Sequence, residues 1–279
     1  MRRTAVNLSF LAFAGLIVAL SIWGPERLAN YRDRKILDRT NVETVDTEGE
    51  GYRYALSSNE KLYILSECLN SQPLTENGQA AAGRTGAGSG TEMDYDSLTG
   101  SYAFIVNHRG PSGQEITDQQ IYDTCITGMD ELKKLSILPG SVRTVEESSY
   151  EAVLYSAIDV LEPRNNVVVW KVSLSTSQKN ADKENRLIDA YIDADDGKFY
   201  EFYVRTPLTW EDINPDDIME QWSGYMGLTG AQPYEAANPL METTPYFKKY
   251  ILPGMGEGKT IVTIGFYEGI NELFLKISR

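Results

Sequence analysis

The acidic residues whose spacing most resembles a metal site lie in YIDADDGKFY, residues 191–200. An EF-hand loop needs glycine at position 6 and a glutamate at position 12. With Asp193 as position 1, Gly197 comes one position early and position 12 is Val204, which has no carboxylate. Acidic residues followed by glycine also form tight turns between strands. The sequence therefore predicts a hairpin turn without a metal, built by Asp193, Asp195, Asp196 and Gly197.

A glycine-rich segment at 78–91 invites comparison with phosphate-binding and catalytic loops. A P-loop requires Lys-Ser or Lys-Thr after its last glycine, and no lysine follows Gly88. A nucleophile elbow requires glycine two positions before the serine, where this chain has Ala87. The composition instead indicates a flexible loop.

The chain has few histidine and cysteine residues that could bind zinc or act in catalysis. The chain has one histidine, His108, and two cysteines, Cys68 and Cys125. A zinc site takes three or four protein ligands, so none is expected. Cys125 lies on the apolar stripe of a predicted helix and should point into the core. The cysteines either form a disulfide in an oxidising compartment or remain two buried free thiols, and the sequence leaves both open.

Paired carboxylates are the remaining catalytic candidates. Asp189 and Asp193 alternate with apolar residues and would lie on one face of a strand, where carboxylates could in principle serve as acid and base. Solvated acids on the exposed face of an antiparallel sheet are the better explanation, so we expect Asp189 and Asp193 to lie on that face. We therefore expect no enzyme activity and no cofactor.

The composition is that of a globular protein. The 279 residues are 42% hydrophobic and 24% charged, with a net charge of −14. Nucleic-acid binding needs clustered Lys and Arg, which an acidic chain does not offer. No nucleic-acid partner is expected.

An apolar run without charge covers residues 4–23 and follows Arg2 and Arg3. A helix of about 20 apolar residues spans a bilayer. A cleaved signal peptide is the alternative, but it needs small residues after the apolar core, where this chain has Leu-Ser-Ile-Trp. The sequence predicts a cytoplasmic tip and transmembrane anchor at 1–25 and a polar stalk at 26–50.

The orientation of this anchor depends on basic residues on both sides. Arg2 and Arg3 favour an inside N-terminus, and the acidic, histidine-poor body is typical of an exported domain. We expect a single-pass membrane protein with an extracytoplasmic C-terminal domain. Charge counting alone leaves the opposite topology open, because four basic residues follow the anchor: Arg27, Arg32, Arg34 and Lys35.

The sequence of residues 51–279 predicts an α+β fold with two units, 51–205 and 206–279. Each unit has a helix followed by antiparallel strands. Helices are expected at 58–69, from an N-cap at Thr117 to 138, and from Pro215 to Gly227. Alternation and turn residues place strands at 101–108, 150–160, 166–176, 187–193, 198–205, 246–252, 259–267 and 272–278.

The segment from the first long helix to the hairpin resembles PepSY-like domains. In these, a Trp-x-Val strand precedes a strand that ends in an Asp-x-x-x-Gly-Lys turn. The matching residues are Trp170, Val172, Asp193, Gly197 and Lys198, within roughly 117–205. The resemblance implies a cystatin-like α+β fold, an extracytoplasmic location and a binding or regulatory role without catalytic residues.

These observations favour a non-catalytic, membrane-anchored module that binds or regulates another protein of the bacterial cell envelope. The segments 78–91 and 229–244 are candidate contact sites. The alternative is an envelope protein that binds a cell-wall glycan or peptide on a sheet face, although packing also explains its aromatic residues. These are Tyr191, Phe199, Tyr200, Phe202 and Tyr203.

Overall fold

A computed structural model describes residues 53–70, 101–112, 115–175, 183–235 and 243–278. The predicted anchor, the stalk and the loop 78–91 lie outside these residues. The chain divides into two compact units, Met1–Thr47 and Glu48–Arg279, and all described residues belong to the second. Within the described ranges, no helix is long and apolar enough to cross a membrane.

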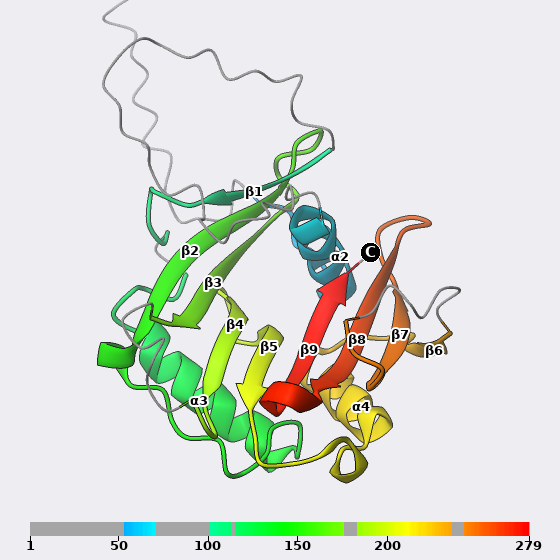
Figure 1. The fold of residues 1–279 in the computed structure, drawn as a ribbon. Coiled ribbons are helices and arrows are strands. Elements are labelled where there is room, and N and C mark those ends of the chain that lie inside the picture. Colours follow the sequence, from blue (N-terminus) through cyan, green and yellow to red (C-terminus); the bar gives the residue numbers. More distant parts are fainter. Residues whose placement is uncertain (1–52, 71–100, 113–114, 176–182, 236–242, 279) are drawn as a thin grey trace, which may run out of the picture. The chain divides into compact units, whose positions relative to one another are not determined.

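The described residues form a mixed α+β structure with three α-helices and one large antiparallel sheet (Figure 1). The helices are α2 (Ser58–Asn70), α3 (Ile121–Lys134) and α4 (Pro215–Met226). The first and third agree closely with the prediction. Asn214 caps α4 by accepting the amide of Asp216, and Gly227 ends it with φ 70°.

The helix predicted from Thr117 to 138 is shorter at both ends. The amide and hydroxyl of Thr117 are both bound to the Gln120 side chain, but the residues between them form a turn and α3 begins at Ile121. At the other end, Ser136 takes a left-handed backbone with φ 59°, which a helix cannot continue through. The chain leaves the helix after Lys134.

Nine strands make up the sheet. Eight agree with the prediction to within a few residues, and the ninth, β6, was not predicted. Their bounds are β1 Tyr102–Val106, β2 Tyr150–Asp159, β3 Asn166–Leu174, β4 Leu187–Asp193, β5 Phe199–Arg205, β6 Gln232–Tyr234, β7 Phe247–Pro253, β8 Lys259–Tyr267 and β9 Glu272–Ser278.

The strand order is β1-β2-β3-β4-β5-β9-β8-β7-β6, with every neighbouring pair antiparallel. Strands β2 to β5 follow one another from the β1 edge of the sheet towards its middle. Strands β6 to β9 do the same from the opposite edge. The two series meet where the last strand of each, β5 and β9, pair with each other (Figure 1). In the chain, β2 to β5 follow helix α3, and β6 to β9 follow helix α4.

Helices cover both faces of the sheet. Helix α2 contacts β1, β2 and β3 as well as β8 and β9, so it lies across one face. Helices α3 and α4 pack on the other: a Cβ on Gly128 of α3 would meet the Phe199 ring at 2.6 Å, and Trp222 of α4 donates to the Phe199 carbonyl at 2.9 Å. Phe199 pairs with Ile192, whose side chain points away from the α2 face.

The prediction that Asp189 and Asp193 lie on a solvated face was wrong. Asp193 is only 2% exposed, because α2 covers it, and Asp189 is half-buried. Strand alternation shows which residues share a face, but it cannot show that a distant helix will cover that face.

Candidate binding surface

The hairpin between β4 and β5 has the predicted turn at Asp193–Gly197. The Asp193 carboxylate accepts the Tyr200 hydroxyl at 2.6 Å, the Asp195 amide at 2.7 Å and the Lys61 ammonium at 3.0 Å. Gly197 has φ 74°, a conformation that disfavours side chains. The four residues singled out from the sequence are thus brought together in one turn, and Asp193 is its buried anchor.

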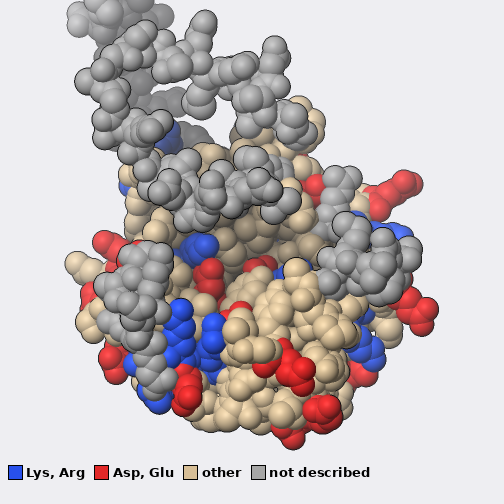
Figure 2. All heavy atoms as spheres, in the orientation of Figure 1, with Lys and Arg blue, Asp and Glu red and all other residues tan. Residues whose placement is uncertain are grey.

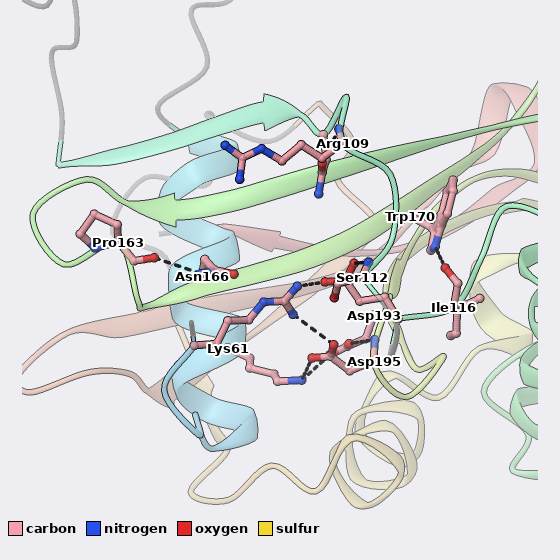
Figure 3. A network of polar contacts seen from close by, with 12 residues as sticks. Lys61, Arg109, Ser112, Ile116, Pro163, Asn166, Trp170, Asp193 and Asp195 are labelled. Carbon is pink, nitrogen blue, oxygen red and sulfur yellow. Dashed lines mark hydrogen bonds and ion pairs between the residues drawn. The ribbon is translucent and has the colours of Figure 1, made fainter. Parts of the chain in front are cut away.

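The acidic side chains of this turn bind basic side chains from an earlier part of the chain (Figure 3). Lys61 of α2 bridges Asp193 and Asp195, at 3.0 and 2.9 Å. Arg53 pairs with Asp195 at 3.1 Å and also with Glu115. Within the described part of the chain, no group of three or more His, Cys, Asp or Glu residues is placed to hold a metal. The turn therefore fixes α2 and the residues before it to the sheet.

The two basic side chains of this network partly offset the charge of its three carboxylates. Burial raises the pKa of Asp193, while the nearby Lys61 lowers it. Burial lowers the pKa of Lys61, but attraction to Asp193 and Asp195 outweighs it and leaves this pKa raised. The sequence offered no signal for this pairing, because 132 positions separate Lys61 from Asp193.

The α2-bearing face also carries a row of side chains that no described helix buries completely. We call Phe104, Val153, Tyr155, Lys171 and Tyr191 the sheet-face band. The pairing register places all five on this face, from β1 to β4. Val153 is 36% exposed, and the other four are half-buried.

Within the band, the aromatic rings support one another and the lysine. Phe104 stacks on Tyr155 with ring centroids 4.7 Å apart and meets Tyr191 edge-on at 5.8 Å. The Lys171 ammonium lies 5.5 Å from the centre of the Tyr191 ring and 3.4 Å from the Asp189 carboxylate. Burial raises the pKa of Tyr191 to about 12, so its hydroxyl is neutral at physiological pH.

Next to the sheet-face band, the same face of the sheet carries acidic side chains that are largely buried. Glu201 accepts the Ile277 amide at 3.0 Å, and burial raises the pKa of its carboxyl to about 7. Asp189 has one carboxylate oxygen, Oδ1, that is buried without a hydrogen-bond partner. Figure 2 shows acidic and basic atoms interspersed on a largely uncharged surface. An apolar, aromatic strip beside fixed charges can bind a protein or peptide surface and needs no nucleophile.

Two pockets lie at the β8–β9 turn. One, of about 480 Å³, includes Lys183, Arg205 and Asn271 among its lining residues. The other, of about 430 Å³, is lined by residues that include Tyr246 and Tyr267.

The remaining candidates from the sequence have simple environments. Neither Cys68 nor Cys125 forms a disulfide; both thiols are fully buried, and burial raises the pKa of both to about 12. Of the two alternatives for the cysteines, the structure therefore has the buried thiols. His108 is exposed.

The candidate contact segment at 229–244 is described only in part. Its first residues include β6, which the sequence analysis missed because Pro233 and the turn-rich sequence indicated a loop. Residues 236–242 lie outside the described part.

Comparison with known proteins adds no relative: no protein-family model, no curated protein and no solved structure matches this chain.

Proposed function

We propose that this chain is a non-catalytic, membrane-anchored, extracytoplasmic module that binds another protein of the cell envelope through the sheet-face band. The observation that carries the proposal is that the band places apolar and aromatic side chains on a partly exposed face of the sheet. Val153 is exposed beside half-buried aromatic rings and a lysine, on a face whose neighbouring helix is held by ion pairs. Aromatic residues with adjacent exposed aliphatic side chains are typical of protein-binding surfaces.

The membrane part of the proposal rests on the sequence. The apolar run at 4–23 has the length of a bilayer span and follows Arg2 and Arg3, which supports an inside N-terminus. The net charge of −14 disfavours adhesion of the body to anionic lipid. The body would then be presented outside the membrane, where envelope proteins are its neighbours.

The fold part of the proposal is that the sheet consists of two cystatin-like units. Helix α3 with β2 to β5 and helix α4 with β6 to β9 have the same order of elements, and the units join at β5 and β9. In the first unit, Trp170 pairs with Ile192 immediately before the Asp193 turn. This arrangement supports the PepSY-like resemblance, which implies binding or regulation.

The test is a pair of aspartate variants of tagged full-length protein, purified after in-membrane crosslinking and analysed by mass spectrometry. Val153→Asp adds a charge to the band. Val160→Asp is the matched control, because Val160 is 39% exposed and lies just beyond the end of β2, outside the band. We expect one dominant envelope protein, reduced at least tenfold by Val153→Asp alone. Equal recovery with both variants, or no protein above background, would contradict the proposal.

A second candidate function is binding of a cell-wall glycan or peptide. The pocket of about 430 Å³ supports it, because the half-buried rings of Tyr246 and Tyr267 line it. Aromatic rings at a pocket can stack on sugar rings or on peptide side chains. Tyr246→Ala would then abolish retention on purified cell-wall material, whereas Val153→Asp would leave it unchanged. Retention that survives Tyr246→Ala would exclude this pocket.

A further inference from the structure

The larger of the two pockets at the β8–β9 turn lies where the two series of strands meet. Strand β5 ends there at Arg205, which pairs with Glu272 at the start of β9 (Figure 1). The pocket has a volume of about 480 Å³, and its lining comes from the residues just before β4, from the end of β5 and from the β8–β9 turn. It lies at the opposite end of β4 and β5 from the Asp193 turn, and no residue of the sheet-face band lines it.

Arg205 is the basic side chain of this pocket that the fold holds in place. Its Nε donates to the Glu272 carboxylate at 2.8 Å, and the Arg205 side chain remains 24% exposed. Nε carries one of the five N–H groups of a guanidinium, and the two Nη atoms carry the other four. Two parallel N–H groups match the two oxygens of a carboxylate. The ion pair therefore orients Arg205 to bind a second carboxylate, and Lys183 adds positive charge to the lining, against one acidic residue, Glu184, which is engaged in another interaction.

An asparagine in the same lining has a polar atom without a partner. The Oδ1 atom of Asn185 is buried and receives no hydrogen bond from any described residue. The backbone around it is fixed, because the Asn185 carbonyl accepts the Arg143 amide at 2.7 Å and its φ is 52°. A buried acceptor without a donor is costly, and native structures keep few of them. A ligand with an N–H group would supply the missing donor.

The pocket also offers an apolar contact. Ile270 is 45% exposed in the β8–β9 turn, and Pro207 lines the pocket as well. A ligand that uses all of these features has a carboxylate, an N–H group near it and an apolar group. The C-terminal residue of a peptide carries these three groups on one carbon atom, whereas an inorganic anion has no apolar group. Pockets that combine apolar walls with a few placed polar groups are typical of small-ligand sites.

We propose that this pocket binds the C-terminal residue of a peptide. Arg205 binds the carboxylate, Asn185 Oδ1 accepts the N–H of the last residue, and its side chain lies against Ile270. The site goes beyond the proposed function, because it is at the junction of β5 and β9 and not on the sheet-face band. It also differs from the pocket lined by Tyr246, although both pockets include Ile270.

Equilibrium dialysis of the purified full-length protein tests the proposal. The ligands are an equimolar library of acetylated tripeptides with every amino acid at the last position. The same library with amidated C-termini is the matched control, because an amide lacks the charge and the second oxygen. We expect retention of a subset of the acids, and at least about tenfold weaker retention of their amides. Failure to retain any acid, or equal retention of acids and amides, would overturn the proposal. So would displacement of the acids by an equal concentration of inorganic phosphate, which would show a site for any anion.

Two variants locate the binding in this pocket. Arg205→Lys keeps the charge but loses the planar pair of N–H groups, and Asn185→Gly removes Oδ1 while glycine keeps the left-handed backbone. We expect each to lower retention of the acids at least about tenfold. Ser136→Gly is the control, because Ser136 has φ 59° and lies outside this pocket. If Arg205→Lys does not fold, Asn185→Gly alone decides. Retention that survives Asn185→Gly, or that Ser136→Gly lowers equally, would contradict the proposal. Crosslinking of the envelope partner reports separately on the proposed function.

Discussion

Replacing Lys61 with methionine should destabilise the protein, because it leaves Asp193 buried without its cation. Asp193 is 2% exposed and Lys61 is 22% exposed in their side chains. Removing one partner of a buried ion pair costs about 3–5 kcal/mol. Asp193 retains the Tyr200 hydroxyl and the Asp195 amide, and Lys61 is partly solvated, so we expect about 2–3 kcal/mol at pH 7.

The pH dependence of this loss distinguishes the ion pair from a simple packing defect. The folded pKa of Asp193 is raised above 3.8 by burial, so its contribution to stability falls as pH rises through the raised value. Without Lys61 that pKa rises further, and ionisation at neutral pH costs more. The difference in unfolding free energy between wild type and Lys61→Met should therefore be larger at pH 7 than at pH 4.

The assay is urea unfolding of the full chain, followed by fluorescence of the buried Trp170 and Trp222. The control is Lys198→Met, which removes a partner of Asp196 at 3.5 Å, where both side chains are at least one-third exposed. An exposed pair contributes about 0–1 kcal/mol. Equal effects of the two variants, or a Lys61→Met effect that does not change with pH, would refute the reasoning.

Three further predictions can be checked by the same unfolding measurement. Glu201 has a folded pKa of about 7 against 4.5 in an unfolded chain, so wild-type stability should fall as pH rises between these values. Glu201→Gln should remove this fall, a difference on the order of 3 kcal/mol at pH 8. Gly265→Ala should cost about 1–3 kcal/mol, because the added Cβ would lie 2.4 Å from the Phe274 ring. Gly227→Ala should destabilise by about 1 kcal/mol, since φ is 70°, whereas Gly224→Ala in the open helix surface should stabilise slightly.

Local patterns predicted most of the described elements. The bounds of β4, β8 and β9 match their expected ranges, because their apolar alternation is interrupted by clear turns. The start of α4 was also predictable, since Asn214 and Pro215 are a strong helix-start signal. The short strand β6 was missed because its pairing with β7 comes from the tertiary fold and its own sequence favours a loop.

The contacts that form the candidate binding surface could be predicted from the sequence only in part. The turn at Asp193 was predicted, but its ion pair with Lys61 depends on where α2 lies, which no local pattern encodes. The sheet-face band likewise joins residues of β1 to β4, and Tyr155 gave no signal that it would stack on Phe104. Single-sequence patterns assign faces within a strand, whereas the cover on each face is set by contacts distant in sequence.

The most direct test of the proposed function is site-specific photocrosslinking from the band. A photoreactive residue is placed at Tyr155 in the full-length protein, and in parallel at the exposed Glu220 of α4, and both are irradiated in intact membranes. Binding through the band predicts one envelope protein that is crosslinked from position 155 and absent from position 220. The same products from both positions, or none from position 155, would contradict it.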